Sequence, residues 1–398
     1  MKRATRLAKM IGLSVVLITL IPGPAATARS SVKIILFIGD GMGEAQRTAA
    51  RWASVGQNGL LAMDQLPFGG QAGTRSAGGE ITDSAAAATA LATGNKTDNG
   101  KIGILPDGTV VKTILELAQE RGMAVGLVTN VQLADATPAA FAAHVAHRSQ
   151  MTEIARQMLT HGIDVLLGGG EDEFLPTYET GCYPEPGERD DGRNLIAEAI
   201  AAGYTYICDA VALTTLDTDR TTHLLGLFSD ETMPRPTTPS LAEMTRVALD
   251  ILSQDPDGFF LMVEGGQIDR ACHGNDAAYA ITDTLELDQA VAVAQAFAAL
   301  YPDTLLIVTA DHETGGMSVH LDSNNAPNQD GPFQMPDGTP FYVRWTTTGH
   351  TAVDVPVTAQ GPWAEELTGR YENTHLFVIM YVKLNNHRYR LFFPFLFR

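Results

Sequence analysis

Positive charge is scarce in this sequence of 398 residues, in which 27 Lys and Arg face 46 Asp and Glu for a formal net charge of −19. Nucleic-acid-binding surfaces need Lys and Arg to neutralise phosphates, so we expect no such surface. Beyond the N-terminus, no run of 18 consecutive apolar residues occurs, so we expect no membrane span. With 45% hydrophobic residues, the composition also excludes a disordered chain and favours a globular one.

Cysteine is rare as well, with only Cys182, Cys208 and Cys272 in the chain. An odd number allows at most one intramolecular pair. We expect the pair to be Cys182–Cys208, because both flank one loop-rich stretch. Cys272 then remains unpaired, and we do not expect it to bind a metal.

The N-terminus has the layout of a secretory signal peptide. Basic residues up to Lys9 precede an apolar run over Met10–Ile21, and Ala26–Ala28 forms a small-x-small cleavage site. We therefore expect residues 1–28 to be a signal peptide and the protein to be exported, to the periplasm or the medium. The alternative is an uncleaved amphipathic anchor.

Short, almost continuously apolar runs alternate with helical patterns along the chain. This alternation predicts an open α/β sheet covered by helices on both faces. The predicted strands are 32–38, 124–129, 164–167, 259–263 and 304–309, and the predicted helices are 111–121, 151–161, 194–202, 241–254 and 285–300. We expect one catalytic domain over 29–381. Within it, 168–239 is predicted to form sheet-edge helices and loops and 322–340 a long loop, and residues 382–398 form an atypical basic and aromatic tail.

Three of the apolar runs end in a carboxylate, at Asp40, Glu264 and Asp311. Ligands gather at the carboxyl ends of parallel strands, where these groups are expected to meet. Three carboxylates at one edge repel each other unless cations lie between them. The pattern therefore indicates a metal site, although a single Asp at a strand end is usually turn chemistry.

Three of the ten histidines occur in patterns that favour metal binding. His273 follows Asp269 by four residues, which places both on one face of a helical turn. His312 follows Asp311 directly, and His350 lies in a Thr-rich loop. Mixed Asp and His ligands suit Zn²⁺, while oxygen ligands suit Mg²⁺. The other seven histidines are treated as ordinary surface or core residues.

Ser84 begins a predicted Ala-rich helix that ends at Gly94. In a purely structural interpretation, this stretch is a capped helix. The functional one places Ser84 at a helix N-terminus, which favours a bound anion. No G-x-S-x-G motif surrounds Ser84, so it is not the nucleophile of an α/β-hydrolase.

These motifs together resemble the alkaline phosphatase family. The stretches that carry the resemblance are Gly39–Gly43, Thr82–Ala87, Asp135–Pro138, Val263–Asp269, Thr309–His312 and Thr348–His350. The resemblance implies a three-layer α/β/α sandwich around a large, mostly parallel sheet, commonly as a homodimer. It also implies hydrolysis of phosphate monoesters through a phosphoserine, with two Zn²⁺ and one Mg²⁺.

The resemblance also implies a role for each site residue. Ser84 corresponds to the nucleophile and Arg148 to the arginine that clamps phosphate. The implied metal ligands are Asp269, His273 and His350 for one zinc; Asp40, Asp311 and His312 for the other; and Asp135, Thr137 and Glu264, with Asp40 bridging, for magnesium. Two other functions remain open from the sequence: a phosphodiesterase of the same superfamily, and an exported phosphate- or metal-binding protein without turnover.

Overall fold

In the computed structural model, which describes residues 31–385, the first apolar run forms the strand β1 (Val32–Gly39). It pairs in parallel with β7 (Gly258–Gly265) on one side and β8 (Thr304–Ala310) on the other. Side chains of β1 from Ile34 to Ile38 have no exposed surface. A strand buried on both faces needs a continuous apolar run, which is what the sequence of β1 provides.

The central sheet has ten strands in the order β15-β2-β14-β8-β1-β7-β3-β4-β6-β5. Only β14 runs against its neighbours, β2 and β8, so the sheet is mostly parallel as predicted. The strands not yet given are β2 (Phe68–Gly73), β3 (Ala124–Gln132), β4 (Val165–Gly169), β5 (Thr205–Ile207), β6 (Leu224–Leu227), β14 (Val355–Gln360) and β15 (Gly369–Glu372).

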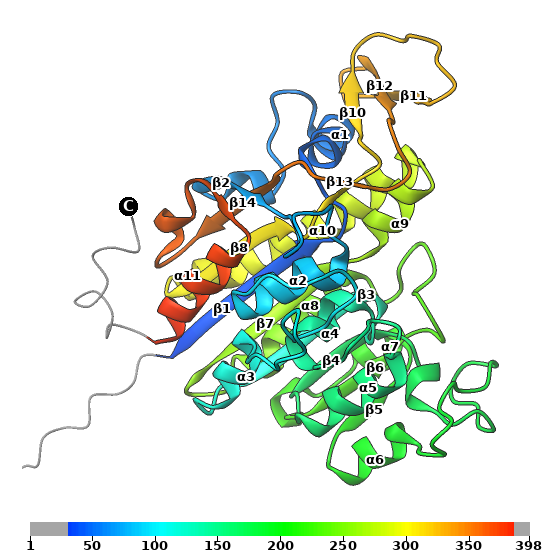
Figure 1. The fold of residues 1–398 in the computed structure, drawn as a ribbon, viewed down its shortest axis with the longest axis vertical. Helices are drawn as coiled ribbons and strands as arrows, with labels where there is room; N and C mark the ends of the chain where they lie inside the picture. The colour runs from blue at the N-terminus through cyan, green and yellow to red at the C-terminus, as the bar shows by residue number, and fades with distance from the viewer. Residues whose placement is uncertain (1–30, 386–398) are drawn as a thin grey trace, which may run out of the picture. The chain divides into compact units, whose positions relative to one another are not determined.

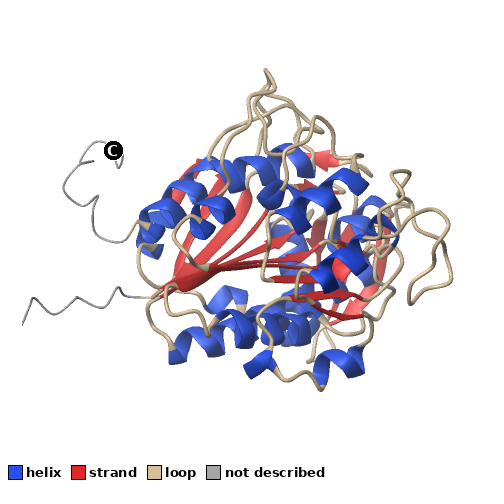
Figure 2. Ribbon diagram, turned by 90° about the horizontal axis from the view of Figure 1, so that it is seen from below, coloured by secondary structure: helices blue, strands red, loops and turns tan. Residues whose placement is uncertain are grey.

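Helices cover both faces of this sheet, which gives the predicted three-layer sandwich (Figures 1 and 2). One layer contains α8 and α10, which pack on each other and on the central strands, and α1, which packs on α10. The other layer contains α2, α3, α4 and α11. The helices are α1 (Glu44–Val55), α2 (Ser84–Thr93), α3 (Ile114–Gln119), α4 (Ala136–Ala142), α5 (Met151–Thr160), α6 (Leu195–Ala201), α7 (Ala210–Thr214), α8 (Leu241–Leu252), α9 (Gln267–His273), α10 (Ala277–Leu300) and α11 (Thr374–Leu384).

Two stretches predicted to hold no strand differ from the prediction. Residues 168–239 contribute β5 and β6 to the sheet edge in addition to helices and loops. Residues 322–340 are not one long loop, because β11 (Gln329–Gln334) pairs with β12 (Pro340–Arg344), and β12 also pairs with β10 (Ser318–His320). The sequence of β11 is polar and has no strand pattern, but pairing with β12 supplies the backbone hydrogen bonds of a strand.

The disulfide joins Cys182 to Cys208, and Cys272 is a buried free thiol, as expected. The expected signal peptide at 1–28 lies outside the described residues, and so do residues 386–398 of the basic and aromatic tail. The tail's first residues belong to α11, which ends at Leu384. Among residues 31–385, no helix combines the length and the apolar character needed to cross a bilayer.

Candidate functional site

The three carboxylates that end apolar runs lie at one edge of the sheet. In the parallel register, Ile38 of β1 is level with Glu264 of β7, and Gly39 is level with Ala310 of β8. Asp40 and Asp311 directly follow β1 and β8 and are level with each other, while Glu264 lies two residues lower, near the carboxyl end of β7. Their side chains are almost completely buried. This concentrates negative charge where strand ends form a binding crevice.

Asp40, Asp311 and His312 form a first buried group of ligand-type atoms. Nε2 of His312 lies 3.2 Å from Oδ2 of Asp311 and 3.5 Å from Oδ1 of Asp40. Both carboxylate oxygens are buried without a hydrogen-bond partner. Burial, reinforced by the neighbouring acids, raises the pKa of Asp40 well above its ordinary value, while burial and Asp269 raise the pKa of Asp311 to about 7. Burial lowers the pKa of His312 to about 3, so its ring is neutral and has a lone pair to offer.

Ser84 faces this first group from the start of α2. Its hydroxyl oxygen lies 3.3 Å from Nε2 of His312, and the residue is only 3% exposed. Asp83 is the N-cap of α2 and accepts hydrogen bonds from the backbone N–H groups of Ala86 and Gly100. The cap fixes the first turn, so Ser84 is held at the positive end of a ten-residue helix.

Asp269, His273 and His350 form a second group, on α9 and on β13 (His350–Thr351). Nε2 of His273 lies 3.2 Å from Nε2 of His350 and 3.2 Å from Oδ2 of Asp269. Each histidine directs Nδ1 at a backbone carbonyl, that of Thr348 for His273 and that of Thr82 for His350. Such bonds fix the tautomer that leaves Nε2 unprotonated, which is the usual arrangement of metal-binding histidines.

Both groups fit divalent cations on structural grounds. In the first, two buried carboxylate oxygens without donors face an unprotonated ring nitrogen. In the second, the Nε2 atoms of His273 and His350, each with a lone pair, lie close to each other and to the carboxylate of Asp269. Within each group, one ligand atom per residue lies within 4.8 Å of the others. A cation between these atoms relieves both the repulsion and the missing hydrogen bonds.

Gly41 and Thr314 join the two groups. Gly41 belongs to the Gly39–Gly43 motif, but neither residue was predicted to have this role. Gly41 has a φ of +72°, and a Cβ there would lie 2.9 Å from the Asp269 backbone and from the Thr314 hydroxyl. Its N–H donates to Asp311, while the Thr314 hydroxyl donates to Asp269 and contacts Nδ1 of His312. Only glycine permits this close approach of β1 to α9.

A third predicted set, Asp135, Thr137 and Glu264, lies beside the first group. The Thr129 hydroxyl donates to Glu264 at 2.6 Å, and burial together with Asp135 raises the pKa of Glu264 to about 8. Within residues 31–385, these carboxylates do not gather as closely as those of the two groups above. The oxygens of Asp135 instead contact guanidinium groups.

Those guanidinium groups belong to Arg148 and Arg270. Nη2 of Arg148 lies 2.8 Å from Asp135, and its Nη1 lies 3.7 Å from Asp83. Arg270 lies 3.4 Å from Asp135 and donates to the Gln132 side chain. Arg148 therefore stands between the N-cap of the Ser84 helix and Asp135, with positive charge facing the site.

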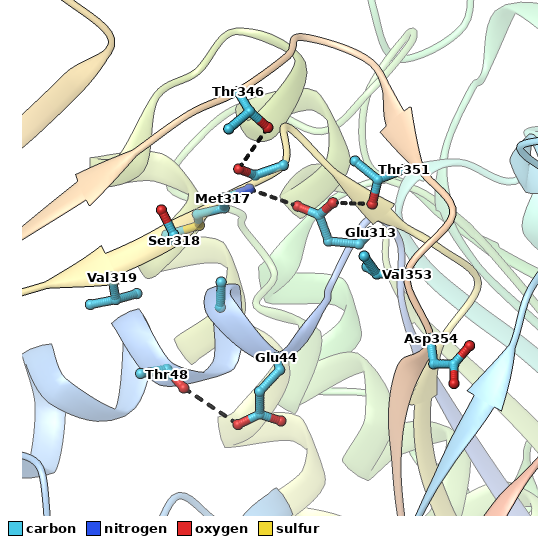
Figure 3. A pocket seen from close by; sticks show the side chains of 12 residues that line it. Glu44, Thr48, Glu313, Met317, Ser318, Val319, Thr346, Thr351, Val353 and Asp354 are labelled. Atoms are coloured by element: carbon cyan, nitrogen blue, oxygen red, sulfur yellow. Dashed lines mark hydrogen bonds between the residues drawn. The ribbon is translucent and has the colours of Figure 1, made fainter. Parts of the chain in front are cut away.

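A pocket of about 630 Å³ is lined by Glu313 and Thr351, the neighbours in sequence of Thr314 and His350 (Figure 3). In the ladder of β9 (Glu313–Thr314) and β13, Thr314 pairs with His350 and Glu313 with Thr351. Side chains alternate across a strand, so Glu313 and Thr351 face away from Asp269 and line the pocket. No residue that the sequence predicts for the site lines it. Glu313 also accepts from Gln46 and from the Met317 N–H, which secures the turn that carries His312.

Comparison with known proteins agrees with this fold. The family model described as alkaline phosphatase matches residues 32–341. Streptomycin-6-phosphate phosphatase of Streptomyces griseus is 38% identical, over 91% of this chain and 94% of its own. The alkaline phosphatase of the Antarctic bacterium TAB5 superposes with a TM-score of 0.77 at 31% identity, covering 89% of this chain and 99% of that one. A variant of that protein with magnesium bound in its M3 site has a TM-score of 0.76 at 33% identity, covering 90% and 99%.

The fold and the relatives define a hydrolase of phosphate monoesters. The chain belongs to the alkaline phosphatase family, as its motifs predicted. This membership makes the protein an enzyme, against the alternative of a binding protein without turnover, and favours monoesters over diesters. Metal cofactors agree with the family and with the two ligand groups.

Proposed function

We propose that the protein is an alkaline phosphatase that hydrolyses phosphate monoesters through a phosphoserine at Ser84. The observation that carries the proposal is the position of the Ser84 hydroxyl, 3.3 Å from His312 in the group that also contains Asp40 and Asp311. A serine there lies at a helix N-terminus that favours anions and next to atoms that suit cations.

The residues divide into three proposed metal sites. Asp269, His273 and His350 would hold one Zn²⁺, and Asp40, Asp311 and His312 the other. Asp135, Thr137 and Glu264 would hold Mg²⁺, with Asp40 shared. When bound, these ions supply positive charge that favours the serine alkoxide and offsets charge on the oxygens of the ester.

The chain's own groups then bind and transfer the phosphoryl group. Arg148 would bind two phosphate oxygens through its planar fork, assisted by the N–H groups that begin α2. Oγ of Ser84 loses its proton to solvent and forms a bond to phosphorus while the bond to the alcohol oxygen breaks; that oxygen takes a proton from solvent and leaves as the alcohol. Water then attacks phosphorus, the Oγ–P bond breaks, Oγ regains a proton that the water gives up, and inorganic phosphate is released.

A substrate pair tests the proposal against the diesterase alternative. The enzyme is assayed on p-nitrophenyl phosphate and on bis-p-nitrophenyl phosphate, before and after chelation. We expect monoester turnover that a chelator abolishes and that zinc and magnesium restore. Preference for the diester, or tight phosphate binding without turnover, would contradict it.

The remaining expectations concern assembly and location. We propose that residues 29–381 form one catalytic domain, that the enzyme is a homodimer, and that it is exported to the periplasm or the medium. The family resemblance supports the dimer, and the basic and apolar N-terminal sequence supports export. Light scattering on the purified protein and the N-terminal sequence of the mature chain test these points.

A further inference from the structure

A third group of ligand-type side chains lies outside the phosphatase site, formed by Glu116, His144 and His161. Candidate ligand atoms of the three lie within 4.8 Å of one another, and all three residues are partly buried. They come from α3, from the segment after α4 and from the end of α5. The alkaline phosphatase mechanism proposed above uses none of them. We propose that this group is an additional zinc site that braces the segment leading to Arg148.

His144 is prepared as a ligand by its surroundings. Its Nδ1 lies 2.8 Å from the carbonyl oxygen of Gly103, so Nδ1 carries the proton and donates. Nε2 then faces Oε1 of Glu116 at 3.1 Å. Two ligands of one tetrahedral zinc, each bonded at about 2.0–2.1 Å, lie about 3.3 Å apart, which is close to this separation. The backbone N–H of His144 also donates to Gln157, so the residue is held on two sides.

Glu116 offers one oxygen to the group and uses the other to hold α3. Its Oε2 accepts from the Thr113 N–H in a capping box, which leaves Oε1 directed at His144. The carboxylate therefore has a fixed position. Glu116 outweighs burial and raises the pKa of His144, so zinc would have to displace a proton from this ring. The resulting set of one anionic and two neutral ligands is one that zinc accepts, with a fourth position for water.

His161 completes the set from the C-cap of α5. Its carbonyl accepts from the Gln119 side chain at 2.7 Å, which ties it to α3. Among residues 31–385, no hydrogen-bond partner for its ring is found, although the ring stands edge-on to that of His144 with centroids 6.3 Å apart. Burial lowers the pKa of His161, so the ring is neutral, and one of its ring nitrogens lies within 4.8 Å of the ligand atoms of Glu116 and His144. Nearby Arg156 is paired with Glu153, which offsets its charge.

Zinc bound here would link α3 and the end of α5 to the segment after α4, which leads to Arg148. Arg148 follows His144 by four residues, and its N–H donates to Gly100. The Gly100–Gly103 stretch meets His144 again through the Gly103 carbonyl. The ion would therefore make the segment 143–150 harder to open, without touching substrate.

The test compares zinc content in the wild-type holoenzyme, two site variants and one control variant. Glu116→Gln keeps the capping box, which accepts Gln at this position, but removes the charge. His161→Ala removes the third ligand, and His320→Ala, whose ring bonds only Ser318 among the described residues, is the matched control. Each protein is loaded with zinc and magnesium, dialysed against buffered free zinc and analysed by mass spectrometry for metal. Crystals of the wild type are measured at the zinc absorption edge.

We expect the wild type and His320→Ala to hold one zinc more per chain than Glu116→Gln and His161→Ala, with an anomalous peak between the three side chains. Added zinc should raise the melting temperature of the wild type more than that of His161→Ala, while turnover of p-nitrophenyl phosphate is equal in both. Equal zinc content in all four proteins would overturn the proposal. So would loss of turnover together with the lost zinc, since the ion removed would then belong to the phosphatase site.

Discussion

The Ser84 hydroxyl oxygen lies 3.3 Å from Nε2 of His312, although 228 residues separate the two in the sequence. Ser84 begins α2, and His312 lies just beyond the carboxyl end of β8, where Asp40 and Asp311 also leave the sheet. A hydroxyl in this position faces buried acids without donors and a neutral imidazole.

Arg148 is predicted to bind the phosphate of the substrate. Replacing it by alanine should lower kcat/KM by about 10²–10³-fold, because charge-assisted paired hydrogen bonds to the transition state are lost. Lysine should recover only part of this, since a point charge cannot reproduce the fork. Steady-state kinetics on p-nitrophenyl phosphate measure the effect. The control is Arg156→Ala, which breaks only a surface pair with Glu153; unchanged kinetics for Arg148→Ala would contradict the role.

His273 and its neighbour Cys272 should behave differently when replaced. His273→Ala should lose one zinc per chain and most of its turnover, because its Nε2 faces His350 and Asp269. Cys272→Ala should keep both. Its thiol is buried beside Gln46, and burial raises its pKa, so it remains protonated and is a poor ligand. The test is to measure the metal content and the activity of both variants. Loss of zinc from Cys272→Ala would show that the thiol is a ligand.

The Cys182–Cys208 disulfide should stabilise the protein without serving catalysis. It closes a loop across a sequence separation of 26, for which chain entropy gives about 3–4 kcal/mol. Replacing both cysteines by serine should lower the free energy of unfolding by up to that amount and leave kcat unchanged. Chemical denaturation and kinetics measure the two quantities, and a large fall in kcat would show that this loop acts on the site.

Asp230 should make stability depend on pH. Burial and the neighbouring acids, Asp172 foremost, raise its pKa to about 6, above the ordinary value of 3.8. The folded state therefore holds this proton more tightly than the unfolded state, and stability falls as pH rises through this window. Asp230→Asn should raise the melting temperature near pH 8 and change it little near pH 4.

The control for that experiment is Asp322→Asn, because the hydrogen bond and charge of Arg344 lower the pKa of this exposed acid. It should give no gain near pH 8. An equal gain for both variants, or a gain for Asp230→Asn near pH 4 as large as near pH 8, would show that ionisation of Asp230 is not the cause.

Sequence patterns predicted the parts of the fold that rest on local chemistry. Continuous apolar runs such as 32–38 predicted the buried central strands, and the family motifs predicted the sandwich. By contrast, β2 is rich in glycine and half exposed, and β11 is polar, so neither has a strand pattern. Their pairing comes from partners distant in the chain, which a local pattern does not contain.

In the candidate site, too, local sequence patterns predicted some residues, while contacts between distant segments determined others. The spacing of Asp269 and His273 on one helical turn is a local signal, and the structure places their side chains 3.2 Å apart. The roles of Thr314 and of Gly41, although Gly41 lies in a family motif, could not be predicted, because their contacts with Asp269 depend on how separate elements approach α9. The sequence analysis did not predict the group of Glu116, His144 and His161 for the same reason, because its members come from three separate segments.

The most direct test of the central claim is to trap the covalent intermediate. Enzyme mixed with a phosphate monoester is quenched in acid, digested and analysed by mass spectrometry, beside Ser84→Ala treated identically. One phosphoryl group should appear on Ser84 of the wild type, and the variant should carry none and lose turnover by several orders of magnitude, while its melting temperature stays close to that of the wild type. A phosphoryl group on another residue, or undiminished labelling of Ser84→Ala, would contradict the mechanism.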